Sequence, residues 1–273
     1  MWGPRRAEAG AKRVCVSSCE RMVVALKTRE ELIGTGECRN RDHEMVRLIG
    51  RHGVMRIEQV QRAMGAGRSA TYSRFAYCEA AGLVERLSIP GVGPILHATR
   101  EGIRYSGLPL PVAKVSAGSI EHSLRCTSVA ISVGTKVGHE AILTEREIVA
   151  AEAFEERPIA SVQVGPASSR RLPRKHRADL AVLREEGTIA IEVELTPKSR
   201  PRLEAIIGAW CEAALGDGDL AAVHYLCAPG QTRNAVERAV EKVGAGSVVA
   251  VIELGEAIGS EESPAAKSGG LSK

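Results

Sequence analysis

Aromatic side chains are scarce in this sequence: two tryptophans, four tyrosines and two phenylalanines make up only 3% of its 273 residues. Proteins that hold single-stranded nucleic acids stack successive bases on exposed rings of this kind. Carbohydrate-binding clefts also depend on such rings. The scarcity therefore argues against both of these classes.

A long apolar run near the N-terminus is also missing. The longest one there, residues 22–26, is too short for the core of a signal peptide and far too short to span a bilayer. Seven cysteines are scattered along the chain, an odd number that does not suggest a disulfide framework. We therefore expect a cytoplasmic protein with reduced thiols and no membrane contact.

Four residues near the N-terminus are potential zinc ligands: Cys15, Cys19, Cys38 and His43. The spacing of Cys15 and Cys19 would suit one face of a helix, but the set forms no compact knuckle. Zinc is therefore not the cofactor that the sequence favours.

The common nucleotide and hydrolase motifs are absent as well. The sequence has no glycine-rich phosphate loop ending in lysine and a hydroxyl residue, so an ATPase or helicase is not expected. Neither a serine nucleophile elbow nor a cysteine–histidine pair stands out.

The composition is that of a folded chain, with 44% hydrophobic residues, 26% charged residues and a net charge of +4. The length fits two compact domains. Two prolines and a glycine between Gly107 and Pro111 stop a helix, so we place the domain boundary there. We expect an N-terminal extension (1–40), a first domain (41–107), a second domain (112–254) and a disordered tail (255–273).

The first domain has the pattern of three helices followed by a hairpin. Apolar residues recur at helical spacing from Met45 and again from Ile57, and a third helix begins near Ser69. Two short strands, 83–87 and 95–98, flank a Pro/Gly turn, and Thr99 is a candidate N-cap for a final helix. This order is that of a winged helix-turn-helix.

The block resembles the winged-helix domains of bacterial transcriptional regulators. The residues that carry the resemblance are Gly82-Leu-Val-Glu-Arg-Leu87 and His97-Ala-Thr-Arg-Glu-Gly102. The resemblance implies that the third helix enters the major groove, where its DNA contacts would be Arg68, Ser69, Thr71, Ser73 and Arg74. It also implies that arginines of the two earlier helices contact the phosphate backbone of the DNA: Arg47, Arg51, Arg56 and Arg62. The alternative is a winged helix that contacts only proteins, with its arginines solvated.

The second domain is expected to be an α/β layer with a mixed sheet, within an α+β protein overall. We expect helices over 121–137, 202–215 and 232–243, and strands over 141–148, 159–164, 178–183, 188–195, 221–227 and 247–254.

The two adjacent strands 178–183 and 188–195 carry the most informative pattern. If Glu186 and Gly187 form a two-residue turn, Asp179 falls opposite Glu194. Alternation then places Asp179, Ala181, Glu192 and Glu194 on one face, and Leu180, Val182, Ile189, Ile191 and Val193 on the other. Because close carboxylates repel one another unless a cation lies between them, this face suits Mg²⁺ or Mn²⁺.

This arrangement resembles the PD-(D/E)xK nuclease fold. The resemblance implies that Asp179 and Glu192 bind the metal, although Ala178 stands where the family has proline. Glu194 occupies the place of the family's lysine. Glu147, or as a second choice Glu145, is the candidate upstream acid, and Lys198 could supply a positive charge from the following loop.

Together, the two domains resemble the replication-relaxation proteins of plasmids and mobile elements. The residues that carry this resemblance are Glu121-His-Ser, Glu145-Arg-Glu147, Arg177-Ala-Asp179 and Ile191-Glu-Val-Glu194. It implies a DNA-binding accessory role in replication, relaxation or transfer. A homodimer is left open.

A basic segment, residues 168–177, leads directly into Asp179. It carries five fixed positive charges and no acid: Arg170, Arg171, Arg174, Lys175 and Arg177. A solvated flexible loop is one interpretation, but its position beside the acidic face favours contact with phosphates.

The leading hypothesis is therefore a protein that binds double-stranded DNA and has a candidate Mg- or Mn-dependent endodeoxyribonuclease site. The alternative is a winged-helix transcriptional repressor whose C-terminal domain only dimerises or binds a partner.

Overall fold

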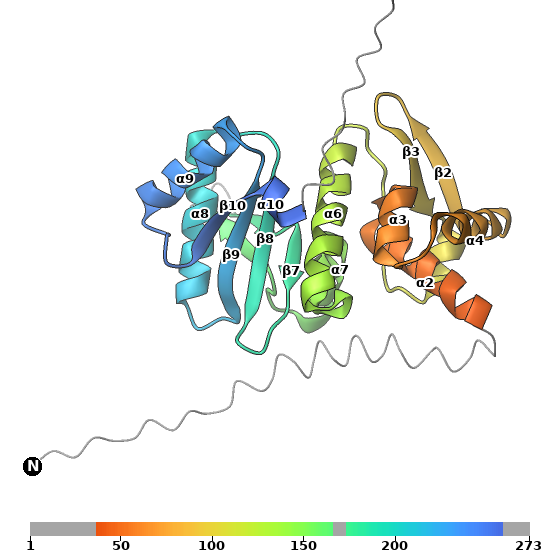
Figure 1. Cartoon of the computed structure of the whole chain (residues 1–273). Coiled ribbons are helices and arrows are strands. Elements are labelled where there is room, and N and C mark those ends of the chain that lie inside the picture. Colours follow the sequence, from red (N-terminus) through yellow and green to blue (C-terminus); the bar gives the residue numbers. More distant parts are fainter. Residues whose placement is uncertain (1–36, 166–172, 259–273) are drawn as a thin grey trace, which may run out of the picture.

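The computed structural model describes residues 37–165 and 173–258, with the side chains of 37–39 left out (Figure 1). Its N-terminal part is helical with a small sheet, and its C-terminal part is a five-stranded mixed sheet with helices on both faces. The expectation of a mixed α/β protein, α+β overall, is confirmed. Within the described residues no helix is long and apolar enough to cross a membrane.

The N-terminal part has the helices and the hairpin that the sequence predicts in this region, and one short strand, Val54–Met55, that it does not predict. They are α2 (Glu37–His52), β1 (Val54–Met55), α3 (Ile57–Ala63), α4 (Arg68–Ala80), β2 (Val84–Ile89), β3 (Gly93–Ala98) and α5 (Arg100–Ser106). The three strands form an antiparallel sheet in the order β1-β3-β2. Met45, Ile49 and Phe75 are fully buried at the centre of its core. Thr99 is confirmed as the N-cap of α5, because its side chain accepts a hydrogen bond from the Gly102 amide.

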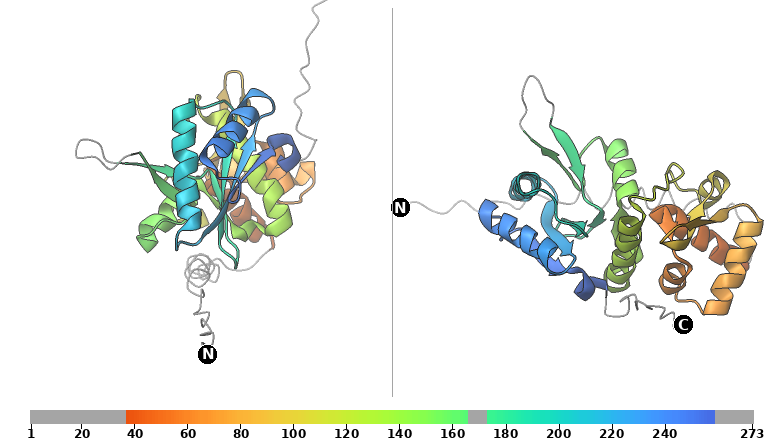
Figure 2. Two further views of the ribbon diagram at one scale, coloured as in Figure 1. Left: turned by 90° about the vertical axis from the view of Figure 1, so that its left-hand side faces the viewer. Right: turned by 90° about the horizontal axis from the view of Figure 1, so that it is seen from above.

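The C-terminal sheet has the order β10-β9-β8-β7-β4. Its strands are β4 (Ile142–Thr144), β7 (Leu180–Val182), β8 (Thr188–Glu194), β9 (Leu220–Cys227) and β10 (Val249–Glu253). The β4–β7 and β7–β8 pairs are antiparallel, whereas β8–β9 and β9–β10 are parallel. The helices α8 (Arg200–Leu215) and α9 (Gln231–Val243) cover one face, and α6 (Ile120–Val137) and α10 (Leu254–Ile258) cover the other (Figure 2).

Helix α6 packs between the two parts of the molecule (Figure 1). Its Val129 and Ala130 belong to the apolar cluster under the C-terminal sheet, while Ile131 belongs to the N-terminal core. The buried Gln59 amide of α3 donates to the Leu124 carbonyl and to the Ser128 hydroxyl of α6. The sheet and the N-terminal part are thus held together through both faces of one helix.

The expected strand over 141–148 is wrong in its second half. Only Ile142–Thr144 is a strand (β4), and α7 (Glu145–Glu155) follows at once. Thr144 and Glu147 form a capping box, in which each side chain accepts a hydrogen bond from the other residue's backbone amide. This local pairing starts a helix where the apolar pattern alone suggested a longer strand.

The predicted hairpin register is wrong by two residues, but the predicted faces of the apolar residues are confirmed. The observed pairs include Leu180 with Ile191 and Val182 with Ile189, which places Asp179 level with Glu192 and not with Glu194. The turn is longer because the Thr188 amide already donates to the Asp219 carbonyl beside β9. A shift of two residues preserves the alternation of the side chains, so Ala181 still faces α8.

Two segments expected to be loop or tail contain regular structure. Strand β6 (Arg174–Arg177) pairs with β5 (Ser161–Val164) in a separate two-stranded ribbon, so the end of the basic segment is a strand. Helix α10 occupies 254–258, inside the expected tail, because Leu254 is buried and the Ser132 hydroxyl holds the Ala257 carbonyl. The rest of the tail and the extension before Glu37 lie outside the described residues.

Candidate functional site

Asp179 lies in a bend immediately before β7, at the end of the sheet where β8 finishes. Its Oδ2 accepts a hydrogen bond of 2.7 Å from the Val193 amide of β8. The carboxylate thus replaces the next backbone bond of the β7–β8 ladder. The same oxygen lies 3.4 Å from Nε2 of His122 on α6, whose Nε2 also lies 3.0 Å from the Val193 carbonyl oxygen.

Glu192 is 2% exposed on β8, and two ring nitrogens meet its Oε1. His176 Nε2 of β6 is 2.7 Å away, and Trp210 Nε1 of α8 donates over 3.1 Å. Burial raises the pKa of Glu192, the His176 hydrogen bond opposes this, and the nearby Asp179 carboxylate raises the pKa further. Asp179 and Glu192 are therefore close enough to repel each other.

Glu194 is buried at the end of β8, and Nζ of Lys198 contacts its carboxylate. Burial lowers the pKa of Lys198, and the charges of Glu192 and Asp179 oppose the shift. The ammonium group therefore lies in the field of all three carboxylates.

Asp179 contacts His122 of α6, whereas Glu192 contacts Trp210 of α8, which covers the other face of the sheet. Among the described residues, the group of potential metal ligands that contains Asp179 includes neither Glu192 nor Glu194. The predicted convergence of these three carboxylates on one ion therefore stays a prediction.

Glu147 does not belong to this group, which corrects the first choice of upstream acid. Its carboxylate caps α7 and accepts bonds from Arg51 of α2, with Nε 2.6 Å from Oε1. The second choice, Glu145, lies close enough to Asp179 to be affected by its charge. Burial is the main cause of the raised pKa of Glu145, and the negative charge of Asp179 raises it further. Because the capping box turns the Glu147 carboxylate back onto the start of α7, Glu145 is the acid of this turn that lies near Asp179.

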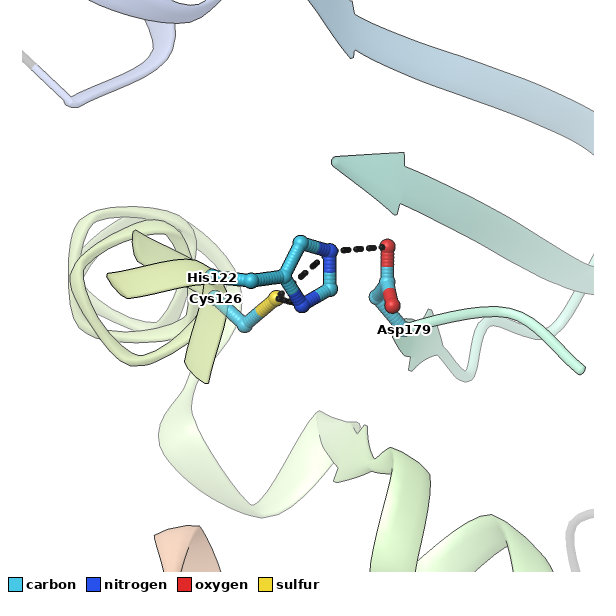
Figure 3. Close-up of side chains that lie close together, drawn as sticks. All are labelled: His122, Cys126 and Asp179. Atoms are coloured by element: carbon cyan, nitrogen blue, oxygen red, sulfur yellow. Dashed lines mark hydrogen bonds and ion pairs between the residues drawn. The ribbon is translucent and has the colours of Figure 1, made fainter. Parts of the chain in front are cut away.

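Four residues of the site were missed by sequence reasoning: His122, Cys126, His176 and Trp210. The ligand atoms of His122, Cys126 and Asp179 all lie within 4.8 Å of one another (Figure 3). The i,i+4 spacing of His122 and Cys126 on an expected helix was the available signal. The sequence around Trp210 gave no such signal, because its hydrogen bond to Glu192 depends on how α8 packs on the sheet.

The basic segment next to Asp179 is only partly available to a partner. Arg170 and Arg171 lie outside the described residues. Nζ of Lys175 is 2.6 Å from the buried Glu152 carboxylate, and Nε of Arg177 is 3.6 Å from it. Burial alone would raise the pKa of Glu152, but its hydrogen bonds, led by the one with Lys175, hold it below the usual range. Arg174 is exposed.

A second basic surface opens on the other side of Lys198. A cavity of about 510 Å³ lies between α8 and α9. Its charged lining is Lys198, Arg200, Arg238 and Lys242 with a single acid, Glu241. Lys198 and Arg200 are already paired with Glu194 and Glu204, so Arg238 and Lys242 carry the remaining positive charge of this lining.

In the N-terminal part, some of the residues of α4 that were expected to contact DNA are exposed, and others are buried or paired within the protein. Arg68, Ser69 and Ser73 are exposed, as are Arg56 and Arg62 at α3. Thr71 is buried and its hydroxyl donates to the Gly67 carbonyl, whereas Arg74 forms an ion pair with Asp42. These two side chains hold α4 in place, which corrects their assignment as DNA contacts. Arg51 is likewise engaged with Glu147.

The structure does not test the potential zinc ligands Cys15, Cys19, Cys38 and His43 as a set, because Cys15 and Cys19 lie outside the described residues. A scan against protein-family models finds no match to this chain. Searches of curated proteins and of solved structures likewise find no significant match.

Proposed function

We propose that this protein binds double-stranded DNA as an accessory factor of the replication-relaxation type, acting in plasmid or mobile-element replication, relaxation or transfer. In this proposal α2–α5 form a winged helix and α6–β10 form a PD-(D/E)xK-like domain. The observation that carries it is the position of Glu192, Glu194 and Lys198 at one end of β8, within the electrostatic influence of Asp179. The order α6-β4-β7-β8-α8-β9, with α7 and the β5–β6 ribbon between β4 and β7 and with antiparallel and then parallel pairing, supports the same fold.

The surface of α4 supports duplex binding by the N-terminal part. Its first turn contains no acid, and Arg68, Ser69 and Ser73 are exposed on it. Arginine and short hydroxyl side chains at the start of a recognition helix suit base edges and phosphates in the major groove. Arg68 also stacks on Tyr72, with its guanidinium carbon 5.5 Å from the ring centre, which orders the side chain before DNA arrives.

The carboxylates fit a hard divalent cation in their chemistry. Asp179 and Glu192 would hold Mg²⁺ or Mn²⁺, which when bound polarises a phosphodiester and activates water. The chain's own residues orient this pair: Val193 fixes Asp179, while Trp210 and His176 fix Glu192. Lys198 and the basic cavity beside it would hold the phosphate backbone.

DNA binding is tested by gel shift with duplex DNA at several salt concentrations. We expect a shift whose affinity falls steeply with salt, and a weaker shift for Arg68→Ala with Ser73→Ala. Arg104→Ala is the matched control, because Arg104 is exposed on α5 and is already paired with Glu101. No shift of the wild-type protein at low salt would overturn the proposal.

A second candidate function is a DNA-binding regulator whose C-terminal domain is not catalytic. It is favoured by the internal partners of the two carboxylates: His176 and Trp210 contact Glu192 Oε1, and Lys198 forms an ion pair with Glu194. Nicking of supercoiled plasmid with Mg²⁺ or Mn²⁺ separates the two functions. The nuclease predicts that Glu192→Gln abolishes nicking, whereas the regulator predicts no nicking by the wild type and an unchanged gel shift of the variant.

A further inference from the structure

A histidine, a cysteine and an aspartate meet where α6 crosses the end of β8 (Figure 3). His122 Nε2 is 3.4 Å from Asp179 Oδ2 and 3.8 Å from Cys126 Sγ. Around a tetrahedral zinc ion with bonds of about 2.0–2.3 Å, neighbouring ligand atoms lie about 3.3–3.6 Å apart. Two of the three separations are therefore near the spacing that such an ion imposes, and the third, between Asp179 and Cys126, is within 4.8 Å.

We infer that His122, Cys126 and Asp179 bind a transition-metal ion of the zinc class. A thiolate and an imidazole are ligands that Zn²⁺ and Co²⁺ prefer and that Mg²⁺ does not, so this site differs in chemistry from the carboxylate pair Asp179 and Glu192. Three protein ligands leave one further position, for water or for the Val193 carbonyl oxygen, which is 3.0 Å from His122 Nε2.

The surroundings of the three residues hold them in place. His122 and Cys126 are four residues apart on the 18-residue helix α6, so both side chains project from one rigid face. The Val193 amide donates to Asp179 Oδ2 and orients that carboxylate, as outer hydrogen bonds commonly do for metal ligands. Little rearrangement is therefore needed to bring the ligands together.

The charge around the thiol favours a cation. Burial raises the pKa of Cys126, and the negative charges of Asp179, Glu145 and Glu192 raise it further. A divalent ion would offset these charges and allow the thiolate to form. Binding would release the Cys126 thiol proton to solvent, and a neutral His122 would carry its proton on Nδ1 so that Nε2 can bind the ion, with no change of oxidation state.

This inference does not depend on DNA binding or cleavage, although Asp179 serves both proposals. The test uses the full-length protein, stripped with a chelator and titrated with Co²⁺. We expect one equivalent to bind with a thiolate-to-cobalt charge-transfer band, and Zn²⁺ to displace it. Cys126→Ser should abolish the band, and His122→Asn should weaken Co²⁺ binding by about tenfold or more.

Two control variants separate this site from other thiols of the chain. Cys211→Ser removes a partly buried cysteine outside the cluster, and Cys15→Ser with Cys19→Ser removes the N-terminal candidates. Both controls should keep the band. No cobalt binding by the wild type, a band that persists in Cys126→Ser, or a band lost in the N-terminal double variant would each overturn the inference.

The His122→Asn protein provides a second readout if Cys126→Ser fails to fold, because cobalt binding must weaken in it as well. Wild-type affinity for cobalt in a folded His122→Asn protein would contradict the inference. Nicking and gel-shift assays address the proposed function separately, since their failure leaves the cobalt spectrum unchanged.

Discussion

At the scale of single residues, two ring nitrogens contact Glu192 Oε1 and lower the free-energy cost of burying this carboxylate. A carboxylate that is 2% exposed is costly unless hydrogen bonds replace its water. His176 comes from the separate β5–β6 ribbon and Trp210 from α8, so two distant elements meet at one oxygen. The acid on β8 thus depends on packing that lies outside its own hairpin.

Replacing Trp210 by phenylalanine tests this dependence. The ring still fills much of the space, but Glu192 loses one donor, so the free energy of unfolding should fall by about 1–3 kcal/mol beyond the packing loss. Urea unfolding measures the change. The cost should shrink in a Glu192→Met background, where no carboxylate needs the donor, and an equal cost in both backgrounds would contradict this account.

The His122–Asp179 pair predicts a pH dependence in the absence of metal. The hydrogen bond with Asp179 raises the pKa of His122 above its ordinary value of 6.5, although burial and Lys198 oppose this. A raised pKa in the folded state stabilises the protein below the unfolded pKa, and the gain is lost as the pH rises through the folded pKa.

Wild-type and His122→Asn proteins should therefore differ more in the free energy of unfolding at about pH 5.5 than at about pH 9. Urea unfolding in the presence of a chelator measures this difference. A difference that is larger at high pH would contradict the sign of the shift.

At the scale of secondary-structure elements, the ion pair between Arg51 and Glu147 joins α2 to the start of α7. The two side chains are 15% and 9% exposed, and Glu147 also accepts a bond from the Thr144 amide. A residue that the sequence suggests as an upstream acid of the site thus attaches the N-terminal part to the sheet.

Glu147→Gln should lower the free energy of unfolding by about 3–5 kcal/mol, because it leaves a mostly buried guanidinium without its counter-charge. The double variant Arg51→Met with Glu147→Met should cost less than the single one. Urea unfolding measures both. At a temperature where the Glu147→Gln protein stays folded, its DNA binding and any nicking should be unchanged. A loss of nicking alone would mean that Glu147 does belong to the acidic site.

The elements also show what the sequence could and could not predict. Alternation along β7 and β8 is local, so it separated Ala181, which faces α8, from Leu180, Val182, Ile191 and Val193, which face α6. The register depended on the contact between Thr188 and Asp219, which are far apart in the sequence. The meeting of His122 with Asp179 requires α6 to cross the end of β8, and no periodicity within either segment encodes that crossing.

At the scale of the whole molecule, positive charge lies at two places far apart in the fold. Arg68 is exposed on α4 at one end, and Arg238 and Lys242 line the cavity beside α9 at the other (Figure 1). Helix α6 connects the two parts through packing on both sides. A long duplex could therefore contact both surfaces of one rigid arrangement.

Removing the cavity charges should change the salt dependence of DNA binding and not only its strength. Each lost phosphate contact lowers the slope of log affinity against log salt by about 0.9, so Arg238→Gln with Lys242→Gln should reduce it by up to about 2. Gel shifts with a long duplex at several salt concentrations measure the slope. Lys136→Gln is the matched control, because Lys136 is exposed in the last turn of α6 and lies outside the cavity. An unchanged slope in the double variant would mean that the duplex contacts the N-terminal part alone, and a reduced slope would place the phosphate backbone beside Lys198 and the acidic end of β8.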